Sequence, residues 1–215
     1  MFRCSVKLTL LLLSLLVLNA FTIVKNPDPS AAKSANLTDA ERMQIFVEEN
    51  WEDKFTPFFA DEVHPFSEVS AALDKDLEQA GSLFGLRPEG EANPWNFVVS
   101  GNGKIVLANT ESRAATADVD VDGDGAADFT LQLGPVIKGT TLRDAATFLK
   151  FSDFRDQIEY AKLARALNTK VHDRLSDSLP LDALEGKDIS FLGALTVRSA
   201  GGDLLVTPIK VQVVQ

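Results

Sequence analysis

The sequence has little of the residue types that most often carry protein chemistry. It contains one cysteine, Cys4, so the chain forms no internal disulfide bond and a disulfide scaffold is excluded. It contains two histidines, His64 and His172, which have no metal-ligand spacing to each other, and it lacks the Gly-x-Ser-x-Gly motif of serine hydrolases. We interpret both histidines as structural residues.

Basic residues are also scarce. The chain has 21 Lys and Arg against 31 Asp and Glu, which gives a net charge of -10. Such a protein repels a phosphate backbone instead of releasing its counterions, so we expect no nucleic-acid partner. The remaining composition, 45% hydrophobic and 24% charged, is that of a globular domain with a hydrophobic core.

Residues 1–24 are predicted to direct export. Arg3 and Lys7 precede an uncharged, leucine-rich run over residues 8–24, which is the order of a signal sequence. As a helix this run is about 26 Å long, within the range that spans a bilayer. The positive charges keep the N-terminus inside, so the rest of the chain faces the periplasm. We favour an uncleaved inner-membrane anchor; the alternative is cleavage near Ala20 and a soluble periplasmic protein.

A linker is predicted over residues 25–36, followed by one periplasmic domain over residues 37–215. The linker has too few apolar groups to pack. In the domain, a capping box at Thr38 and Glu41 opens a helix that we expect to end near Phe55, before Pro57.

The remaining elements indicate an α+β fold. A second helix is expected from Ser67 to Gly81, and a third from about residue 152 or 153 to beyond Leu175. Strands are expected at 95–99, 104–109, 115–121, 127–133, 188–198 and 204–214, with a hairpin turn at Gly101-Asn102-Gly103 between the first two. This order predicts an antiparallel, OB-like β-barrel with packed helices, preceded by the N-terminal membrane anchor helix.

The sharpest chemical signal is an acidic loop between two predicted strands, residues 120–128. Calcium takes about six to eight oxygen ligands, and alternate residues of a curling loop turn their carboxylates to one centre. We predict calcium ligands at Asp120, Asp122, Asp124, Asp128 and the carbonyl of Ala126. Leu131 replaces the glutamate of helix-loop-helix sites, so the loop resembles the calcium-binding hairpins of integrin-type propeller blades. The alternative is an exposed Asp-Gly turn that binds no metal.

A ligand site is predicted from charged and aromatic residues near strand ends. The candidate ligand-binding residues are Trp95, Glu111, Arg113, Lys138 and Arg143. An arginine can pair two N–H groups with a carboxylate or phosphate ligand, but equally with Glu111 or Asp144. Taken singly, each candidate is also compatible with a surface charge or, for Trp95, with core filling.

Several motifs together resemble a known family. They are Pro94-Trp95-Asn96-Phe97, Thr110-Glu111-Ser112-Arg113, the acidic loop, Leu133-Gly134-Pro135-Val136-Ile137-Lys138-Gly139-Thr140, Leu142-Arg143-Asp144-Ala145 and Gln157-Ile158-Glu159-Tyr160-Ala161. On these the chain is similar to the bacterial predicted periplasmic lipoproteins of domain of unknown function 2291. The resemblance implies a membrane-anchored periplasmic protein without established activity, often encoded beside sugar ABC transporters. Members usually carry a lipobox cysteine, whereas Phe21 follows Ala20 here, which favours a peptide anchor.

Three functions follow as hypotheses. The first is a noncatalytic binding or accessory protein, linked to a sugar ABC transport system, with a calcium-stabilised hairpin. The second is a metal-dependent hydrolase, in which the clustered carboxylates and a metal activate water. The third is a purely structural envelope protein. The hydrolase hypothesis lacks an acid-base partner next to the acidic loop.

Overall fold

The structure is a computed structural model that describes residues 37–214 except 89 and 91. The chain divides into two units, residues 1–36 and residues 37–215. The predicted anchor and linker lie in the first unit, outside the described residues. Within the described part of the chain, every helix is too short or too polar to cross a membrane.

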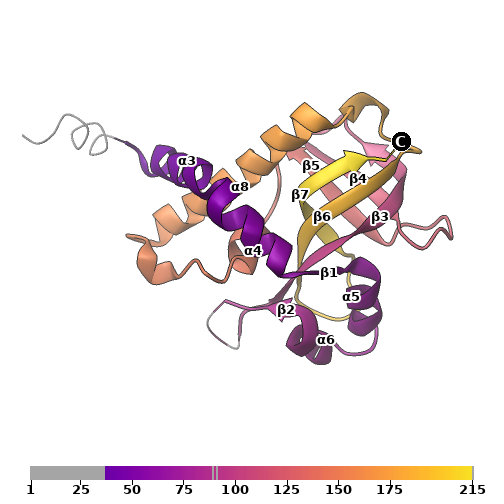
Figure 1. The fold of residues 1–215 in the computed structure, drawn as a ribbon, viewed down its shortest axis with the longest axis horizontal. Helices are drawn as coiled ribbons and strands as arrows, with labels where there is room; N and C mark the ends of the chain where they lie inside the picture. Colours follow the sequence, from indigo (N-terminus) through magenta and orange to yellow (C-terminus); the bar gives the residue numbers. More distant parts are fainter. Residues whose placement is uncertain (1–36, 89, 91, 215) are drawn as a thin grey trace, which may run out of the picture. The chain divides into compact units, whose positions relative to one another are not determined.

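A closed five-stranded β-barrel forms the centre of the domain (Figure 1). Its strands are β3 (Trp95–Asn109), β4 (Ala114–Asp120), β5 (Phe129–Pro135), β6 (Asp188–Val197) and β7 (Leu205–Val213). They follow the order β3-β4-β5-β7-β6, and β6 pairs with β3 to close the barrel. All pairs are antiparallel except the short β5–β7 pair. The expected barrel and the mixed α+β class are confirmed.

The expected hairpin turn at Gly101-Asn102-Gly103 is wrong, because β3 continues through these residues as one strand. Gly101 and Gly103 pair with Phe191 and Ile189 of β6. Neither glycine has the positive φ that a tight hairpin turn requires. Their role is close approach: a Cβ on Gly103 would lie 2.7 Å from a methyl group of Val119. Glycine therefore lets the long strand bend around the barrel, as it does at barrel corners.

The first helix is longer than expected and changes its winding. The capping box is confirmed: Thr38 accepts from the Glu41 amide, and Glu41 accepts from the Thr38 amide. Helix α3 (Asp39–Asn50) continues through a π-helical turn (Trp51–Phe55) into α4 (Thr56–Asp61). Pro57 does not end the helix, because it falls in the first turn of α4, where its missing N–H costs little.

The second expected helix is two helices, α5 (Phe66–Leu73) and α6 (Leu77–Phe84). The break occurs at residues 74–76, because the Asp76 side chain accepts from the Gln79 amide and caps a new helix. Gly81 lies inside α6 and does not end it. A Cβ there would lie 2.2 Å from the Trp95 ring, so the glycine admits the indole. Two short strands, β1 (Val63–Pro65) and β2 (Gly85–Leu86), extend the sheet beside β3.

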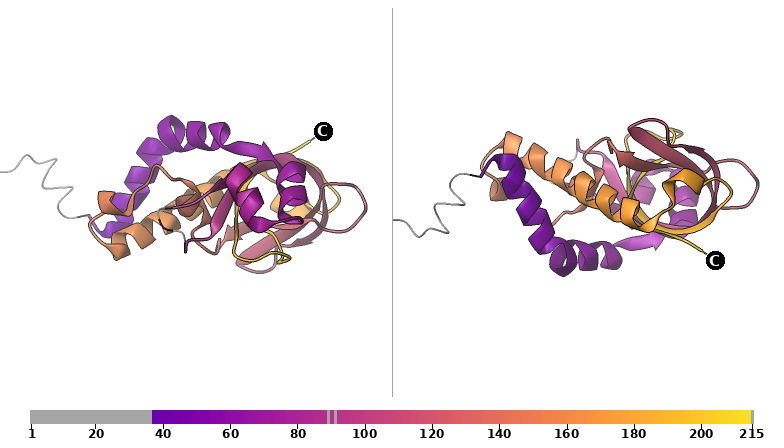
Figure 2. Two further views of the ribbon diagram at one scale, coloured as in Figure 1. Left: turned by 90° about the horizontal axis from the view of Figure 1, so that it is seen from below. Right: turned by 90° about the horizontal axis from the view of Figure 1, so that it is seen from above.

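The last helix, α8 (Gln157–Ser178), begins later than expected, because Asp156 caps it by accepting from the amides of Ile158 and Glu159. Short helices precede and follow it: α7 (Thr141–Ala145) and 3-10 turns at Phe151–Asp153 and Leu181–Ala183. Helices α3 and α8 lie side by side outside the barrel in both views of Figure 2. A Lys170–Glu48 ion pair joins the two helices, and an Arg174–Glu52 ion pair joins α8 to the π-helical turn after α3.

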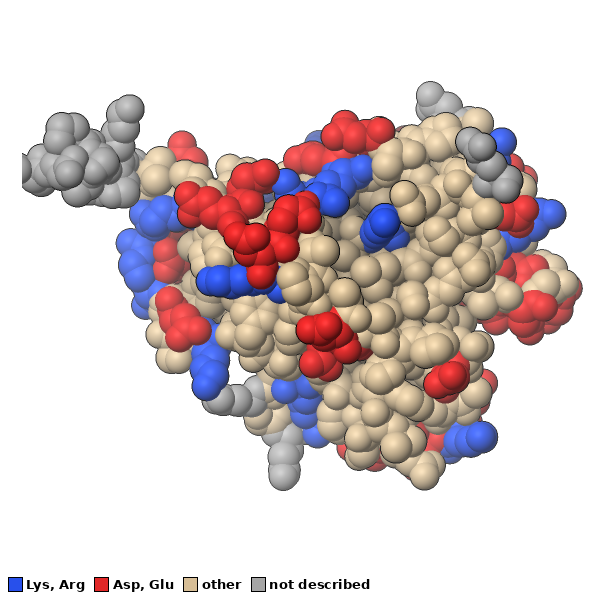
Figure 3. All heavy atoms as spheres, viewed as in Figure 1, with Lys and Arg blue, Asp and Glu red and all other residues tan. Residues whose placement is uncertain are grey.

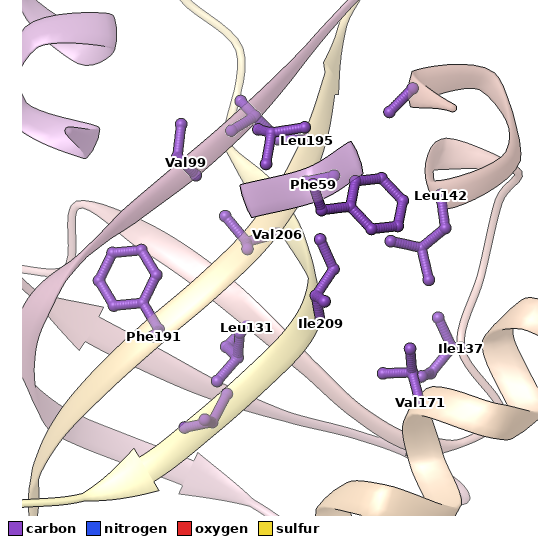
Figure 4. Packing of buried hydrophobic residues seen from close by; sticks show 14 of the residues in the cluster. Phe59, Val99, Leu131, Ile137, Leu142, Val171, Phe191, Leu195, Val206 and Ile209 are labelled. Carbon is purple, nitrogen blue, oxygen red and sulfur yellow. The ribbon is translucent and has the colours of Figure 1, made fainter. Parts of the chain in front are cut away.

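One hydrophobic core connects the barrel to its helices. In Figure 4, Leu131 and Val206 lie between the strands, and Val171 of α8 lies beside Ile137. A second part of the core is aromatic: Phe55 contacts the rings of Trp51 and Phe148 at centroid distances of 5.9 and 5.2 Å. The helical layer is thus held to the barrel mainly by burial of large apolar side chains.

Candidate functional site

The acidic loop connects β4 to β5 and protrudes from the barrel, and Asp and Glu spheres gather at this place in Figure 3. Its geometry is set by Asp120, which is buried. One carboxylate oxygen of Asp120 accepts from the Gly123 amide at 2.6 Å and the other from the Gly125 amide at 2.9 Å. Both glycines have positive φ, 83° and 90°, which glycine adopts without strain.

The structure brings together three of the four predicted carboxylate ligands of calcium. One carboxylate oxygen each of Asp120, Asp122 and Asp124 lies within 4.8 Å of the others. Asp128 is used differently, since its carboxylate accepts from the Val121 amide at 2.6 Å. The backbone amide of Ala126 donates to Asp124 at 2.7 Å. Aspartate–amide hydrogen bonds thus shape this loop, and Asp128 lies outside the three-carboxylate group.

A second candidate site is a cleft of about 540 Å³, which we call the arginine cleft. It lies where α7 and the start of α8 meet the loop before β3. Its lining combines charged, aromatic and small apolar residues: Arg87, Pro88, Asn93, Pro94, Arg143, Asp144, Ala146, Thr147, Leu149, Lys150, Phe151 and Tyr160. A larger hollow of about 830 Å³ borders the acidic loop, but strand backbone and glycines form much of its wall. The arginine cleft is therefore the richer site for a small ligand.

Arg143 is held rigidly in this cleft. Its Nε and Nη2 both donate to Oδ1 of Asp144, at 2.9 and 2.7 Å. The guanidinium carbon lies 4.1 Å from the centre of the Tyr160 ring, in cation–π geometry. The second Asp144 oxygen accepts from the Thr140 hydroxyl at 2.5 Å, so both oxygens of this carboxylate have partners. Arg143 thus pairs with Asp144, one of the alternatives that the sequence left open.

Arg87 is the second guanidinium of the cleft. Its carbon lies 3.7 Å from the centre of the Trp95 ring, and its Nη2 donates to Glu78 at 3.4 Å. The Trp95 indole N–H donates to the same carboxylate at 3.2 Å. The Nε of Arg87 is buried, and no acceptor among the described residues lies within hydrogen-bond distance of it. An arginine with so few acceptors retains donor capacity for a ligand.

Tyr160 forms an aromatic wall of the cleft with Phe151, whose ring meets it edge to face at 5.5 Å. Burial is the largest cause that raises the pKa of Tyr160 above its ordinary value; Arg143 opposes the shift and the Asp144 carboxylate reinforces it. At neutral pH the phenol is therefore protonated. It can donate a hydrogen bond, and it is a poor general base.

This pKa shift can be measured directly, because Tyr160 is the only tyrosine of the chain. We expect the tyrosinate absorbance of the folded protein to rise at a higher pH than that of the protein unfolded in denaturant, which titrates near pH 10. The folded state binds the Tyr160 proton more tightly than the unfolded state does. The protonated phenol therefore contributes fully to the free energy of unfolding below about pH 10, and this contribution is lost as pH rises through the folded-state pKa. Coincident titration curves would contradict the burial of the phenol.

The predicted ligand residues do not form one cluster. Arg143 lines the cleft, and Trp95 lies behind Arg87 at its edge. Glu111 and Arg113 are exposed in the loop between β3 and β4, and Lys138 is exposed beyond β5. None of these three lines the arginine cleft.

Sequence reasoning missed the other charged and aromatic residues of the cleft. Arg87 belongs to a loop with no periodic signal, and Tyr160 lies on the apolar face of the last predicted helix, so neither residue indicates a ligand site by itself. Lys150 and Phe151 reach the cleft through a turn that precedes α8. The one usable signal was the adjacent Arg143-Asp144 pair.

The two histidines lie apart from both sites. His64 packs against the Phe84 ring at 5.0 Å, and Nδ1 of His172 is hydrogen-bonded to the Leu133 carbonyl at 2.9 Å. His172 also fills the space over Gly134, where a Cβ would lie 2.7 Å from its ring. These contacts agree with the interpretation of both as structural residues.

With the fold and the sites described, comparison with known proteins gives a family. The profile of the predicted periplasmic lipoprotein family DUF2291 matches residues 11–212. The chain belongs to this family. Membership confirms the resemblance found in the sequence and supports a periplasmic location. No curated protein matches the chain.

The fold is also found in a solved structure. A crystal structure of an OB-fold protein from Thermotoga maritima is similar with a TM-score of 0.58 and 19% sequence identity. The match covers 88% of this chain and 99% of the other. At this identity the likeness establishes the fold, which agrees with the closed five-stranded barrel, and it carries no functional inference.

Proposed function

We propose that this family member is a noncatalytic binding protein of the periplasm, that the arginine cleft is its ligand site, and that it assists a sugar ABC transport system. The observation that carries the proposal is the combination, in one cleft of about 540 Å³, of the Tyr160 and Phe151 rings with the donors of Arg87 and Arg143. A small-ligand site typically has this volume and this mixture of apolar walls with a few fixed polar groups. The apolar face of a sugar ring packs on an aromatic wall while its hydroxyls pair with the donors.

The noncatalytic character is supported by the state of the groups in the cleft. The guanidinium groups of Arg87 and Arg143 are hydrogen-bond donors without an acceptor atom, so they suit ligand binding. The pKa of Tyr160 is raised mainly by burial, so its phenol stays protonated. The Asp144 carboxylate is occupied by Arg143 and Thr140. These groups can bind and orient a ligand, whereas a metal-dependent hydrolase would have to work from the acidic loop without a histidine beside it.

We also propose that the acidic loop binds calcium as a structural ion. The three converging carboxylates of Asp120, Asp122 and Asp124 support this proposal, because they supply hard oxygen ligands and repel each other without a cation. Calorimetric titration tests it: calcium should bind in the millimolar range or tighter, and Asp122→Asn should weaken it. Absence of any heat at millimolar calcium would leave the loop as a plain Asp-Gly turn.

The anchor belongs to the same proposal. We propose that residues 1–24 hold the domain at the inner membrane and that residues 25–36 tether it, so that the cleft operates close to a membrane transporter. Extraction of the protein from membranes distinguishes this arrangement from the alternative of cleavage near Ala20. An uncleaved anchor resists alkaline carbonate and requires detergent, whereas a cleaved protein is released with the periplasm.

A thermal melt of the full chain in detergent against a panel of sugars tests the ligand site. A ligand at 100 times its Kd stabilises the folded state by about 2.7 kcal/mol. For a domain of this size that raises the Tm by roughly 5 to 10 °C. Arg143→Lys keeps the charge but loses the two-pronged geometry, and should remove most of this increase.

The matched control is Arg113→Lys, the same exchange at an exposed residue outside the cleft. It should leave the ligand-induced increase in Tm unchanged. An unchanged Tm across the whole panel would count against the binding function and leave the structural envelope role as the better explanation.

A further inference from the structure

We propose that the arginine cleft selects sugar-sized ligands that carry an anionic group, a carboxylate or a phosphate, over neutral sugars. This inference rests on the proposed binding function and names its ligand class. Its starting point is an imbalance of charge among the described lining residues: three cations, Arg87, Arg143 and Lys150, stand against one carboxylate, that of Asp144.

The carboxylate does not neutralise the cleft. Oδ1 of Asp144 accepts two hydrogen bonds from Arg143, and Oδ2 accepts one from the Thr140 hydroxyl. It therefore balances one guanidinium and has no oxygen left for Arg87 or Lys150. Among the described residues, Arg87 has one ion pair, a long 3.4 Å contact to Glu78, whose side chain is 71% exposed to solvent.

Several N–H donors of the cleft have few hydrogen-bond acceptors among the described residues. The side chain of Arg87 makes one hydrogen bond to a described residue, and its buried Nε makes none. Nη1 of Arg143 makes one long bond, 3.4 Å, to the Tyr160 carbonyl. Lys150 is exposed at the rim, and its ammonium has no ion pair within the described residues. Charged donors form their strongest hydrogen bonds with anionic oxygens. Among these described contacts the one anionic acceptor is the Glu78 carboxylate, at 3.4 Å.

The positions of the two guanidiniums are fixed before a ligand arrives. Trp95 supports one at 3.7 Å and Tyr160 supports the other at 4.1 Å. Because stacked arginines lose little side-chain freedom on binding, their donors are preorganised for a planar or tetrahedral anion. In a chain of net charge -10, such a cleft is a local exception to the acidic surface and concentrates anions where they are bound.

The experiment compares three probes of one ring size on the full chain in detergent at low salt: glucose, glucuronate and glucose 6-phosphate. Calorimetric titration should give at least one of the two anions a Kd roughly tenfold or more below that of glucose, because charge-assisted hydrogen bonds replace solvent contacts. The Kd should rise several-fold when sodium chloride is raised to a few hundred millimolar. Which anion binds distinguishes a sugar acid from a sugar phosphate.

Variants assign the effect to the cleft. Arg87→Gln should weaken the anionic probe about tenfold and weaken any glucose binding by a clearly smaller factor, because a neutral hydroxyl loses one hydrogen bond and no charge. Because Arg87 stacks on Trp95, the melt of the ligand-free variant checks that it folds. Lys150→Gln, at the exposed rim, provides a second variant with a smaller loss in the same direction. The control Arg165→Gln removes one positive charge from an exposed position of α8, outside the cleft, and should change nothing.

The outcomes separate the two proposals. Equal binding of glucose and the anions would overturn the anionic preference while the binding function stands. Binding of inorganic phosphate in an Arg87-dependent manner, without any sugar, would remove the sugar function and retain an anion site. If neither the three sugar probes nor inorganic phosphate binds, both the binding function and the anionic preference are overturned.

Discussion

Replacement of Phe55 by alanine is expected to destabilise the domain by about 3 to 5 kcal/mol. The side chain is fully buried, with 0% exposure, in the π-helical turn that joins α3 to α4. Its ring contacts four other aromatic rings, those of Phe46, Trp51, Phe59 and Phe148. Truncation therefore removes transfer free energy and leaves a cavity that rigid neighbours cannot fill. Urea unfolding of residues 37–215, followed by circular dichroism, measures the loss.

The control for this prediction is Ile45→Ala on the neighbouring helix α3. Ile45 is 44% exposed, so its truncation should cost less than about 1 kcal/mol. Equal losses in the free energy of unfolding for the two substitutions would contradict the burial of Phe55 in the aromatic cluster.

The substitution Gly103→Ala is expected to cost about 1 to 3 kcal/mol, and Gly103→Val more. A Cβ at this position would lie 2.7 Å from the Val119 side chain and 2.8 Å from the carbonyl oxygen of Asp120. The strands β3 and β4 would have to separate where the barrel bends. Because Gly103 has an ordinary extended conformation, the cost is steric and does not come from backbone strain.

The matched control is Gly202→Ala, in the turn between β6 and β7. There the nearest atom to an added Cβ is 3.9 Å away and φ is not positive, so alanine should be neutral within about 0.5 kcal/mol. A tolerated alanine at position 103 would favour the hairpin turn at Gly101-Asn102-Gly103 that the sequence suggests over the continuous strand.

The barrel could be predicted from the sequence because its strands alternate and its turns carry their own residue signals. The capping box at Thr38 and Glu41 depends only on local spacing and was predicted correctly. The predictions were wrong where a glycine that resembles a turn residue or a helix end is needed for close packing against a residue distant in sequence. Gly101 and Gly103 look like a turn, yet they make room for Phe191 and Val119. Gly81 looks like a helix end, yet it makes room for Trp95.

The candidate sites differ in the same way. The acidic loop is contiguous in sequence, so its three converging carboxylates could be predicted from spacing alone. The arginine cleft is assembled from separate parts of the chain: residues 87, 88, 93 and 94 before β3, seven residues between positions 143 and 151, and residue 160. Only the fold shows that Arg87 and Arg143 line the same cleft. Arg143 and Trp95 were predicted as ligand residues individually, without the geometry that relates them.

The long strand β3 also determines when the domain can fold during export. Its first ten residues, 95–104, pair with residues 188–197 of β6, whereas its second half pairs with β4 directly after it. In export from the N-terminus, which the proposed anchor implies, β3 and β4 reach the periplasm well before β6. Until β6 arrives, the β6-facing edge of the first half of β3 is unpaired, and other chains can join it. The barrel therefore cannot close before β6 and β7 have been exported, and a chain truncated before residue 188 is expected to aggregate in the periplasm.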